Sequence, residues 1–143
     1  AYLTAHPPGL PTTMHFNEHS VDGVALLLWA AAPEQPELLA TPFFHAAAAA
    51  AMDLPVEVYF TARSVLLLKP GVAAGLRPGS HPKTVLDSLR EAHELGVKFL
   101  VCTDALRAHG LADTPLIDEV HGRGGAVQFM ARAADRRWRT LVY

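Results

Sequence analysis

The fold expected for this chain is decided by residues 97–104, whose sequence is VKFLVCTD. Gly96 ends a helical pattern, and the β-branched and aromatic residues after it predict a short buried strand over residues 97–101. Cys102, the only cysteine of the chain, follows that strand directly. We therefore expect a thiol at the carboxyl end of a strand, which is the edge at which open α/β sheets bind their ligands.

A helix is predicted directly after this strand. Thr103 and Asp104 offer side-chain oxygens for its N-cap, the helical segment continues to His109, and Gly110 ends it. The free N–H groups at a helix N-terminus favour a thiolate over a thiol. The position of Cys102 therefore suits chemistry at sulfur, although a free cysteine commonly serves as a small buried hydrophobic residue instead.

The rest of the chain alternates between strand and helix patterns. Strands are predicted at residues 24–30, 56–61, 97–101 and 138–143. Helices are predicted from residue 36 or 41 to residue 52, and at residues 83–95, 103–109 and 126–134. This alternation indicates one α/β domain over residues 21–143, a three-layer sandwich with a mostly parallel sheet of four to five strands. The last strand alternates between polar and apolar residues, as an edge strand does.

Two segments between residues 110 and 126 predict no strand. Residues 116–120 predict one or two helical turns, and the glycine-rich residues 122–125 predict a turn. The glycine-rich segment resembles a phosphate-binding loop only loosely, because it lacks the lysine and the preceding strand.

Composition excludes several classes of function. The chain has 143 residues, 50% of them hydrophobic, and a formal net charge of -2, so neither a nucleic-acid nor a membrane-surface partner is expected. No apolar run reaches the roughly twenty residues that span a bilayer. One cysteine cannot form an intramolecular disulfide, and no signal-peptide pattern is present, so we expect a cytoplasmic protein.

Residues 1–20 are rich in proline and predict an extended N-terminal arm. His15 and His19 are four residues apart, a spacing that would place both imidazoles on one face of a helix. The segment before them is rich in proline and no third ligand lies nearby, so we expect neither a metal site nor a cofactor.

Several of these segments, in their order, resemble the DsrE/DsrF-like family. They are residues 56–61, 65–68, 96–102 and 109–111, followed by a final helix and strand that end at residues 140–143. The resemblance covers residues 22–143 and implies a small α/β fold that assembles as trimers or hexamers. It also implies, for some members, a sulfur relay in which a cysteine at the end of a strand carries a persulfide between donor and acceptor proteins; Cys102 is similar to a cysteine of this kind.

Three residues are candidates for the chemistry itself. Besides Cys102, they are His45 in the first turn of the helix after the first strand, and Arg63 after the second strand. In a parallel sheet the loops after all strands open at the same edge, so these residues are expected near one another. Arg63 would stabilise a thiolate or persulfide anion, and His45 would exchange the thiol proton.

Three further residues at this edge are candidates for ligand binding. Ser64 follows the second strand, and Thr103 and Asp104 follow Cys102. Simpler interpretations exist for Ser64 and Asp104, since serine commonly forms turns and aspartate commonly caps helices.

Two functions from different classes remain open. The chain is either a sulfur carrier or sulfurtransferase-like protein that uses Cys102, or a non-catalytic module that binds a small ligand or supports assembly while Cys102 is a spectator. A peroxide-reducing enzyme is a weaker interpretation, because no second cysteine is present to resolve a sulfenic acid. A homo-oligomer is expected in either case, since it would cover the exposed edge strand.

Overall fold

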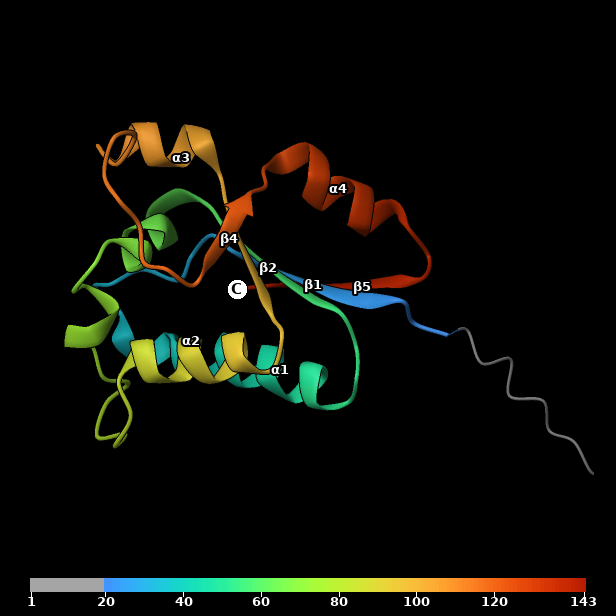
Figure 1. Cartoon of the computed structure of the whole chain (residues 1–143), viewed down its shortest axis with the longest axis horizontal. Helices are drawn as coiled ribbons and strands as arrows, with labels where there is room; N and C mark the ends of the chain where they lie inside the picture. The colour runs from blue at the N-terminus through green and yellow to red at the C-terminus, as the bar shows by residue number, and fades with distance from the viewer. Residues whose placement is uncertain (1–19) are drawn as a thin grey trace, which may run out of the picture.

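The computed structural model describes residues 20–143 of the chain, which are drawn in colour in Figure 1. The predicted arm, with His15 and His19, therefore lies outside the described residues apart from Ser20. The described strands are β1 (Gly23–Leu28), β2 (Val56–Phe60), β3 (Lys98–Val101), β4 (Val120–Arg123) and β5 (Trp138–Val142). The described helices are α1 (Ala40–Ala51), α2 (Val85–Glu94), α3 (Thr103–Ala108) and α4 (Ala126–Ala134), with 3-10 turns η1 (Pro36–Leu38), η2 (Ala62–Leu68) and η3 (Ala73–Gly75).

The strands form one parallel sheet in the order β4-β3-β2-β1-β5. Helices α1 and α2 cover one face of this sheet, and α4 covers the other, while α3 lies beyond the carboxyl end of β3 (Figure 1). This arrangement confirms the predicted three-layer α/β sandwich. The predicted edge position of the last strand is also confirmed, since β5 is the outermost strand beside β1.

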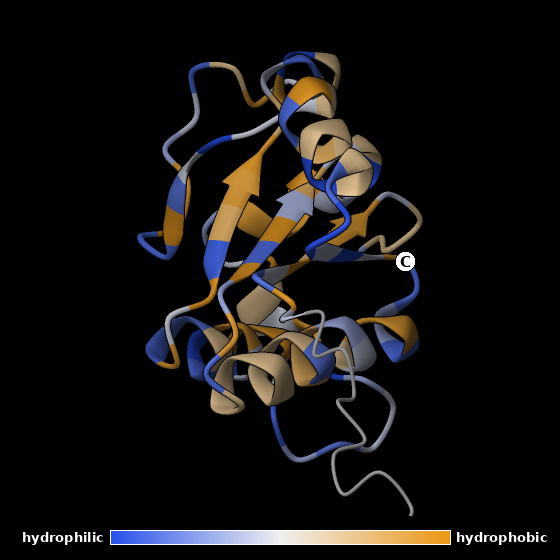
Figure 2. Cartoon of the chain, turned by 90° about the vertical axis from the view of Figure 1, so that its right-hand side faces the viewer, coloured by the Kyte–Doolittle hydropathy of each residue, from blue (hydrophilic) through white to orange (hydrophobic). Residues whose placement is uncertain are grey.

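The larger core lies between the sheet and the helices α1 and α2. Its centre is an aromatic cluster of Phe43, Phe60 and Phe99, whose ring centroids lie 5.7 to 6.3 Å apart. Side chains alternate along β2, so Val58 and Phe60 face this core. Tyr59 belongs instead to a smaller cluster under α4, with Ala25, Leu100 and Phe129. The central strands are covered on both faces and are coloured as largely hydrophobic in Figure 2.

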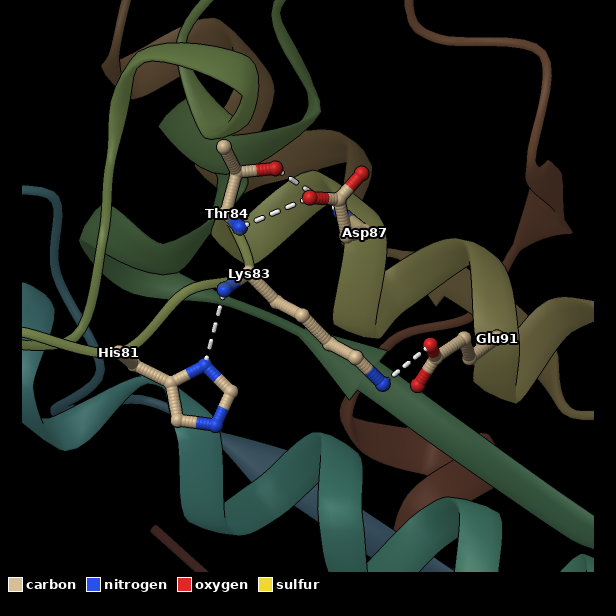
Figure 3. Close-up of polar contacts among 5 residues, drawn as sticks. All are labelled: His81, Lys83, Thr84, Asp87 and Glu91. Atoms are coloured by element: carbon tan, nitrogen blue, oxygen red, sulfur yellow. Dashed lines mark hydrogen bonds and ion pairs between the residues drawn. The ribbon is translucent and has the colours of Figure 1, made fainter.

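Helix α2 begins with a reciprocal pair of hydrogen bonds (Figure 3). The Asp87 N–H donates to Thr84 Oγ1 at 3.1 Å, and the Asp87 carboxylate accepts from the Thr84 N–H at 2.9 Å. These hydrogen bonds hold the pKa of Asp87 below its usual value. The segment before the helix is fixed by a Lys83 N–H bond to His81 Nδ1 at 3.1 Å, and by a Lys83–Glu91 ion pair at 2.5 Å. Local capping therefore explains why the helix begins at Val85.

The structure corrects two predictions from the sequence. Residues 120–123, expected as a helical turn followed by a glycine turn, form the strand β4, because β3 offers them an open edge for hydrogen bonding. The pairing of β4 with β3 shifts its register between Phe99 and Leu100. A strand as short and polar as β4 also shows no hydrophobic pattern in the sequence. The N-cap of α3 is Cys102, with no side-chain cap, so Thr103 and Asp104 lie inside the first turn rather than capping it.

Candidate functional site

Cys102 lies at the junction of β3 and α3. Its backbone N–H donates to the carbonyl of Phe60 at 2.9 Å, and its own carbonyl accepts from the Leu106 N–H at 3.1 Å. The first bond continues the pairing of β3 with β2 by one residue, and the second begins the helix. Cys102 is partly exposed at the carboxyl edge of the sheet, where its side chain also packs against the larger core.

Cys102 lines a small apolar cavity between the sheet and α4. The cavity has a volume of about 270 Å³. It is lined by Leu27, Tyr59, Phe60, Thr61, Cys102, Gly124, Gly125, Ala126, Phe129 and Met130. An apolar cavity of this size accommodates a group at least as large as a benzene ring, since a cavity of about 150 Å³ already binds benzene.

A second, wider cavity of about 600 Å³ opens beside the first. The two share Cys102, Gly124, Gly125 and Ala126. The second cavity is more polar, because its lining includes Thr103, Asp104, Arg123 and Gln128. Cys102 therefore lies where an apolar cavity and a polar one adjoin.

Gly124 allows the chain to pass closely over the sheet between the two cavities. A Cβ at this position would lie 2.9 Å from Leu100 Cβ and 3.1 Å from Tyr59 Cε1, which is closer than packed carbon atoms tolerate. At Gly125 a Cβ would meet no atom within 4 Å. Packing therefore requires a glycine at position 124 but not at position 125.

One cation, one carboxylate and the free N–H groups at the start of a helix lie at the polar cavity. Helix α4 begins there with no side-chain cap at Gly125, so the N–H groups of its first turn are available to an anion. Arg123 at the end of β4 is exposed and forms no ion pair with any described residue. Asp104 is paired with Arg107 at 3.4 Å, which offsets its negative charge.

Tyr59 connects the apolar cavity to a buried ion pair. Its hydroxyl donates to Glu57, whose carboxylate also accepts from Arg132 Nη2 of α4 at 2.6 Å. The Arg132 guanidinium lies over the Trp138 ring at 3.8 Å from its centroid. Burial and the Glu57 carboxylate raise the pKa of Tyr59 above its ordinary value. This network fixes α4 to the sheet and so fixes one wall of the cavity.

Three of the residues predicted from the sequence lie outside both cavities that Cys102 lines. His45 on α1 is exposed and hydrogen-bonded to the hydroxyl of Tyr143. Arg63 is paired with Glu34. Ser64 is fully buried and accepts from the Thr61 N–H at 3.0 Å, with the carbonyls of Leu28 and Thr61 each 2.7 Å from its hydroxyl. The structure brings Cys102, Thr103 and Asp104 together, but not these three.

Sequence reasoning missed the opposite wall of the site. Arg123, Gly124 and Gly125 were expected in a turn and were not counted as site residues, yet they line the cavities beside Cys102. The missed signal is topological. Once residues 120–123 are recognised as a parallel strand beside β3, the residues after it must lie at the same edge as Cys102.

Among the described residues, no three His, Cys, Asp or Glu side chains are grouped to hold a metal ion. The part of the chain that the structure describes also contains no helix long and apolar enough to cross a membrane.

Comparison with known proteins gives one family and one fold. The sequence profile of the DsrE/DsrF-like family matches residues 24–142. The structure is similar to the crystal structure of the ychN protein from E. coli, with a TM-score of 0.62 and 20% identity over 85% of this chain and 99% of that chain. It is also similar to MTH1491, a protein of unknown function from Methanobacterium thermoautotrophicum, with a TM-score of 0.59 and 19% identity over 84% of this chain and 97% of that one.

A third similar structure is BT1422, a conserved protein of unknown function from Bacteroides thetaiotaomicron. The TM-score is 0.59 and the identity 12%, over 87% of this chain and 97% of that one. Comparison with curated protein sequences finds no significant match. At these sequence identities, the structural similarity shows a shared fold and nothing further.

Proposed function

This chain belongs to the DsrE/DsrF-like family, and from that premise we propose that it is a sulfur carrier that holds sulfane sulfur as a persulfide on Cys102. The observation that supports the proposal is the position of Cys102, which is partly exposed and lines two adjoining cavities at the carboxyl edge of the sheet. In this proposal a donor and then an acceptor approach the same sulfur atom at this edge of the sheet.

The loading step is a displacement at sulfur. The Cys102 thiolate attacks the terminal sulfur of a persulfide donor, R–S–SH. A new bond forms between Cys102 Sγ and that sulfur, the donor's S–S bond breaks, and its electron pair leaves with the donor as the thiolate R–S⁻. The protein is left with Cys102–S–SH, and an acceptor thiolate that attacks the outer sulfur releases the Cys102 thiolate again. No external oxidant or reductant is consumed.

In this proposal, groups that line the polar cavity interact with the anionic donor and acceptor species. Arg123 and the first turn of α4 provide positive charge and N–H donors beside the cavity that Cys102 lines. In this proposal Arg123 has the role that the sequence assigned to Arg63, which is paired with Glu34. The roles of His45 and Ser64 in catalysis or binding stay predictions.

The test is direct detection of the carried sulfur. The reduced protein is exposed to inorganic polysulfide and desalted, and its intact mass is measured before and after treatment with dithiothreitol. We expect a gain of one sulfur atom that dithiothreitol removes, and no gain in the matched variant Cys102→Ser. A protein that gains no sulfur on Cys102 would favour the non-catalytic alternative, in which the same cavities hold a ligand without chemistry.

We also propose that the chain acts in the cytoplasm as a homo-oligomer, a trimer or hexamer, that exchanges sulfur with a donor or acceptor protein. Support for assembly comes from the two edges of the sheet, since β4 and β5 each pair on one side only.

A further inference from the structure

The two adjoining cavities at Cys102 differ in polarity. This difference indicates which kind of sulfur donor would fit the site. Resting on the proposed function, we propose that the compound that loads Cys102 is a small organic sulfane-sulfur donor with an apolar body and an anionic group next to its terminal sulfur. An organic thiosulfonate, R–SO₂–S⁻, has this chemistry.

The apolar cavity sets the size and polarity of the donor's body. Its apolar walls are Leu27, Phe60, Phe129 and Met130 together with Tyr59, whose hydroxyl is already bound to Glu57. Because Thr61 is the one hydroxyl side chain of the lining besides Tyr59, a polar donor body would lose more hydration there than it regains, whereas an apolar one gains by leaving water. The volume of about 270 Å³ suits a phenyl-sized group rather than a protein segment.

The polar cavity supplies the complementary charge. Arg123 forms no ion pair within the described part of the chain, and the first turn of α4 has no side-chain cap. Both line the second cavity, which adjoins the apolar one at Cys102. A donor with its body in the apolar cavity would place its sulfonyl group and terminal sulfur beside Cys102, where the two cavities meet, and Arg123 and the first turn of α4 would stabilise the sulfinate as it leaves.

The reaction balances without a further reactant. The Cys102 thiolate attacks the terminal sulfur of R–SO₂–S⁻ and forms the bond Sγ–S. The bond between the two donor sulfurs breaks, and its electron pair leaves with the sulfinate R–SO₂⁻. The products are the persulfide Cys102–S–S⁻ and one sulfinate anion, which conserves both negative charges.

The experiment compares benzenethiosulfonate, methanethiosulfonate and inorganic thiosulfate, with inorganic polysulfide as the general loading reagent. The initial rate of sulfur gain on Cys102 is divided by the rate of the same donor with free cysteine, which removes differences in leaving-group chemistry. We expect benzenethiosulfonate to exceed methanethiosulfonate by about tenfold, because burial of a phenyl ring is worth more than the 1.4 kcal/mol that a tenfold ratio needs. Arg123→Gln should lower the rate with both thiosulfonates by about tenfold.

The matched control is Arg136→Gln, which removes an exposed arginine from the turn before β5, at the opposite edge of the sheet. It should leave all rates unchanged. Binding of benzenesulfinate to Cys102→Ser, followed by NMR, tests the cavities without any sulfur transfer, and we expect saturable binding that Arg123→Gln weakens.

The outcomes separate the two proposals. Loading by polysulfide without any advantage of benzenethiosulfonate, or with Arg123→Gln equal to Arg136→Gln, would overturn the small-donor inference in favour of a protein donor, while leaving the carrier function intact. Failure of every donor to load Cys102 would overturn the carrier function, and the small-donor inference with it. Absence of benzenesulfinate binding would also overturn the inference.

Discussion

At the scale of single residues, Gly124 and Gly125 make a matched pair that tests how tightly the site is packed. A serine at position 124 would push its Cβ to 2.9 Å from Leu100 Cβ and toward Tyr59, both of which are buried. A serine at position 125 has open space and the preferred chemistry of an N-cap. We expect Gly124→Ser to lower the free energy of unfolding by about 1–3 kcal/mol and Gly125→Ser to leave it nearly unchanged, as measured by urea denaturation.

If Gly124→Ser were the more stable of the two variants, the chain would be able to move away from the sheet at this position without losing free energy of unfolding. The close approach to Leu100 and Tyr59 would then not define the cavity wall.

Tyr59 gives the protein a dependence of stability on alkaline pH. Burial and the neighbouring Glu57 raise its pKa above the ordinary value of 10.0, so the folded state keeps a proton that the unfolded state loses. The stabilisation is fully present below pH 10 and is lost as pH rises above it, by about 1.4 kcal/mol per pH unit for each such group. Burial raises the pKa of Tyr143 in the same direction. We expect Tyr59→Phe to make the decline between pH 10 and 11 shallower.

The measurement is urea denaturation of both proteins at several pH values from 8 to 11. At pH 8 the variant should already be less stable by about 1–2 kcal/mol, because Glu57 loses a hydrogen-bond donor. Parallel curves for the two proteins above pH 10 would show that Tyr59 does not titrate differently on unfolding.

At the scale of elements, one buried ion pair holds α4 against the sheet. Arg132 of α4 pairs with Glu57 of β2, whose side chain is 9% exposed, whereas Arg107 pairs with Asp104, whose side chain is 90% exposed. Arg132→Gln leaves the buried Glu57 carboxylate without its cation and with Tyr59 as its remaining donor, and we expect a loss of about 2–4 kcal/mol. Arg107→Gln is the control and should cost less than about 1 kcal/mol. If urea denaturation showed that both variants lose the same free energy of unfolding, the result would contradict a stabilising ion pair between Arg132 and the buried Glu57.

The elements also show what the sequence could predict. Strands with continuous apolar runs, such as β1 and β3, and the helices between them were predictable because their own residues carry the pattern. Strand β4 was not predictable from its own residues, because all four are at least partly exposed. Its position depends on pairing with the open edge of β3. The position of Cys102 followed from β3 alone, whereas the cavity wall at Arg123 and Gly124 depended on β4 and was missed for that reason.

At the scale of the whole molecule, large apolar side chains are exposed on both β5 and α4. Exposed side chains there are Val127 and Met130 on α4, Leu141 and Val142 on β5, and Trp29 after β1. β1 pairs with β2 and β5 on its two sides, so β5 leaves its other edge free. A free strand edge beside large apolar side chains is the kind of surface that proteins cover by association.

Assembly through this surface is testable by charge insertion. Val142→Lys places an ammonium group on β5, where the side chain is 57% exposed, so folding should tolerate it while burial in an interface would not. Met52→Lys is the matched control, because Met52 is 72% exposed after the end of α1, away from β5. We expect sedimentation velocity to show an oligomer for the unaltered chain and for Met52→Lys, and a shift toward monomer for Val142→Lys. A monomer in all three proteins at high concentration would contradict assembly, whereas an oligomer that survives Val142→Lys would place the interface elsewhere, with the free edge of β4 as the remaining candidate.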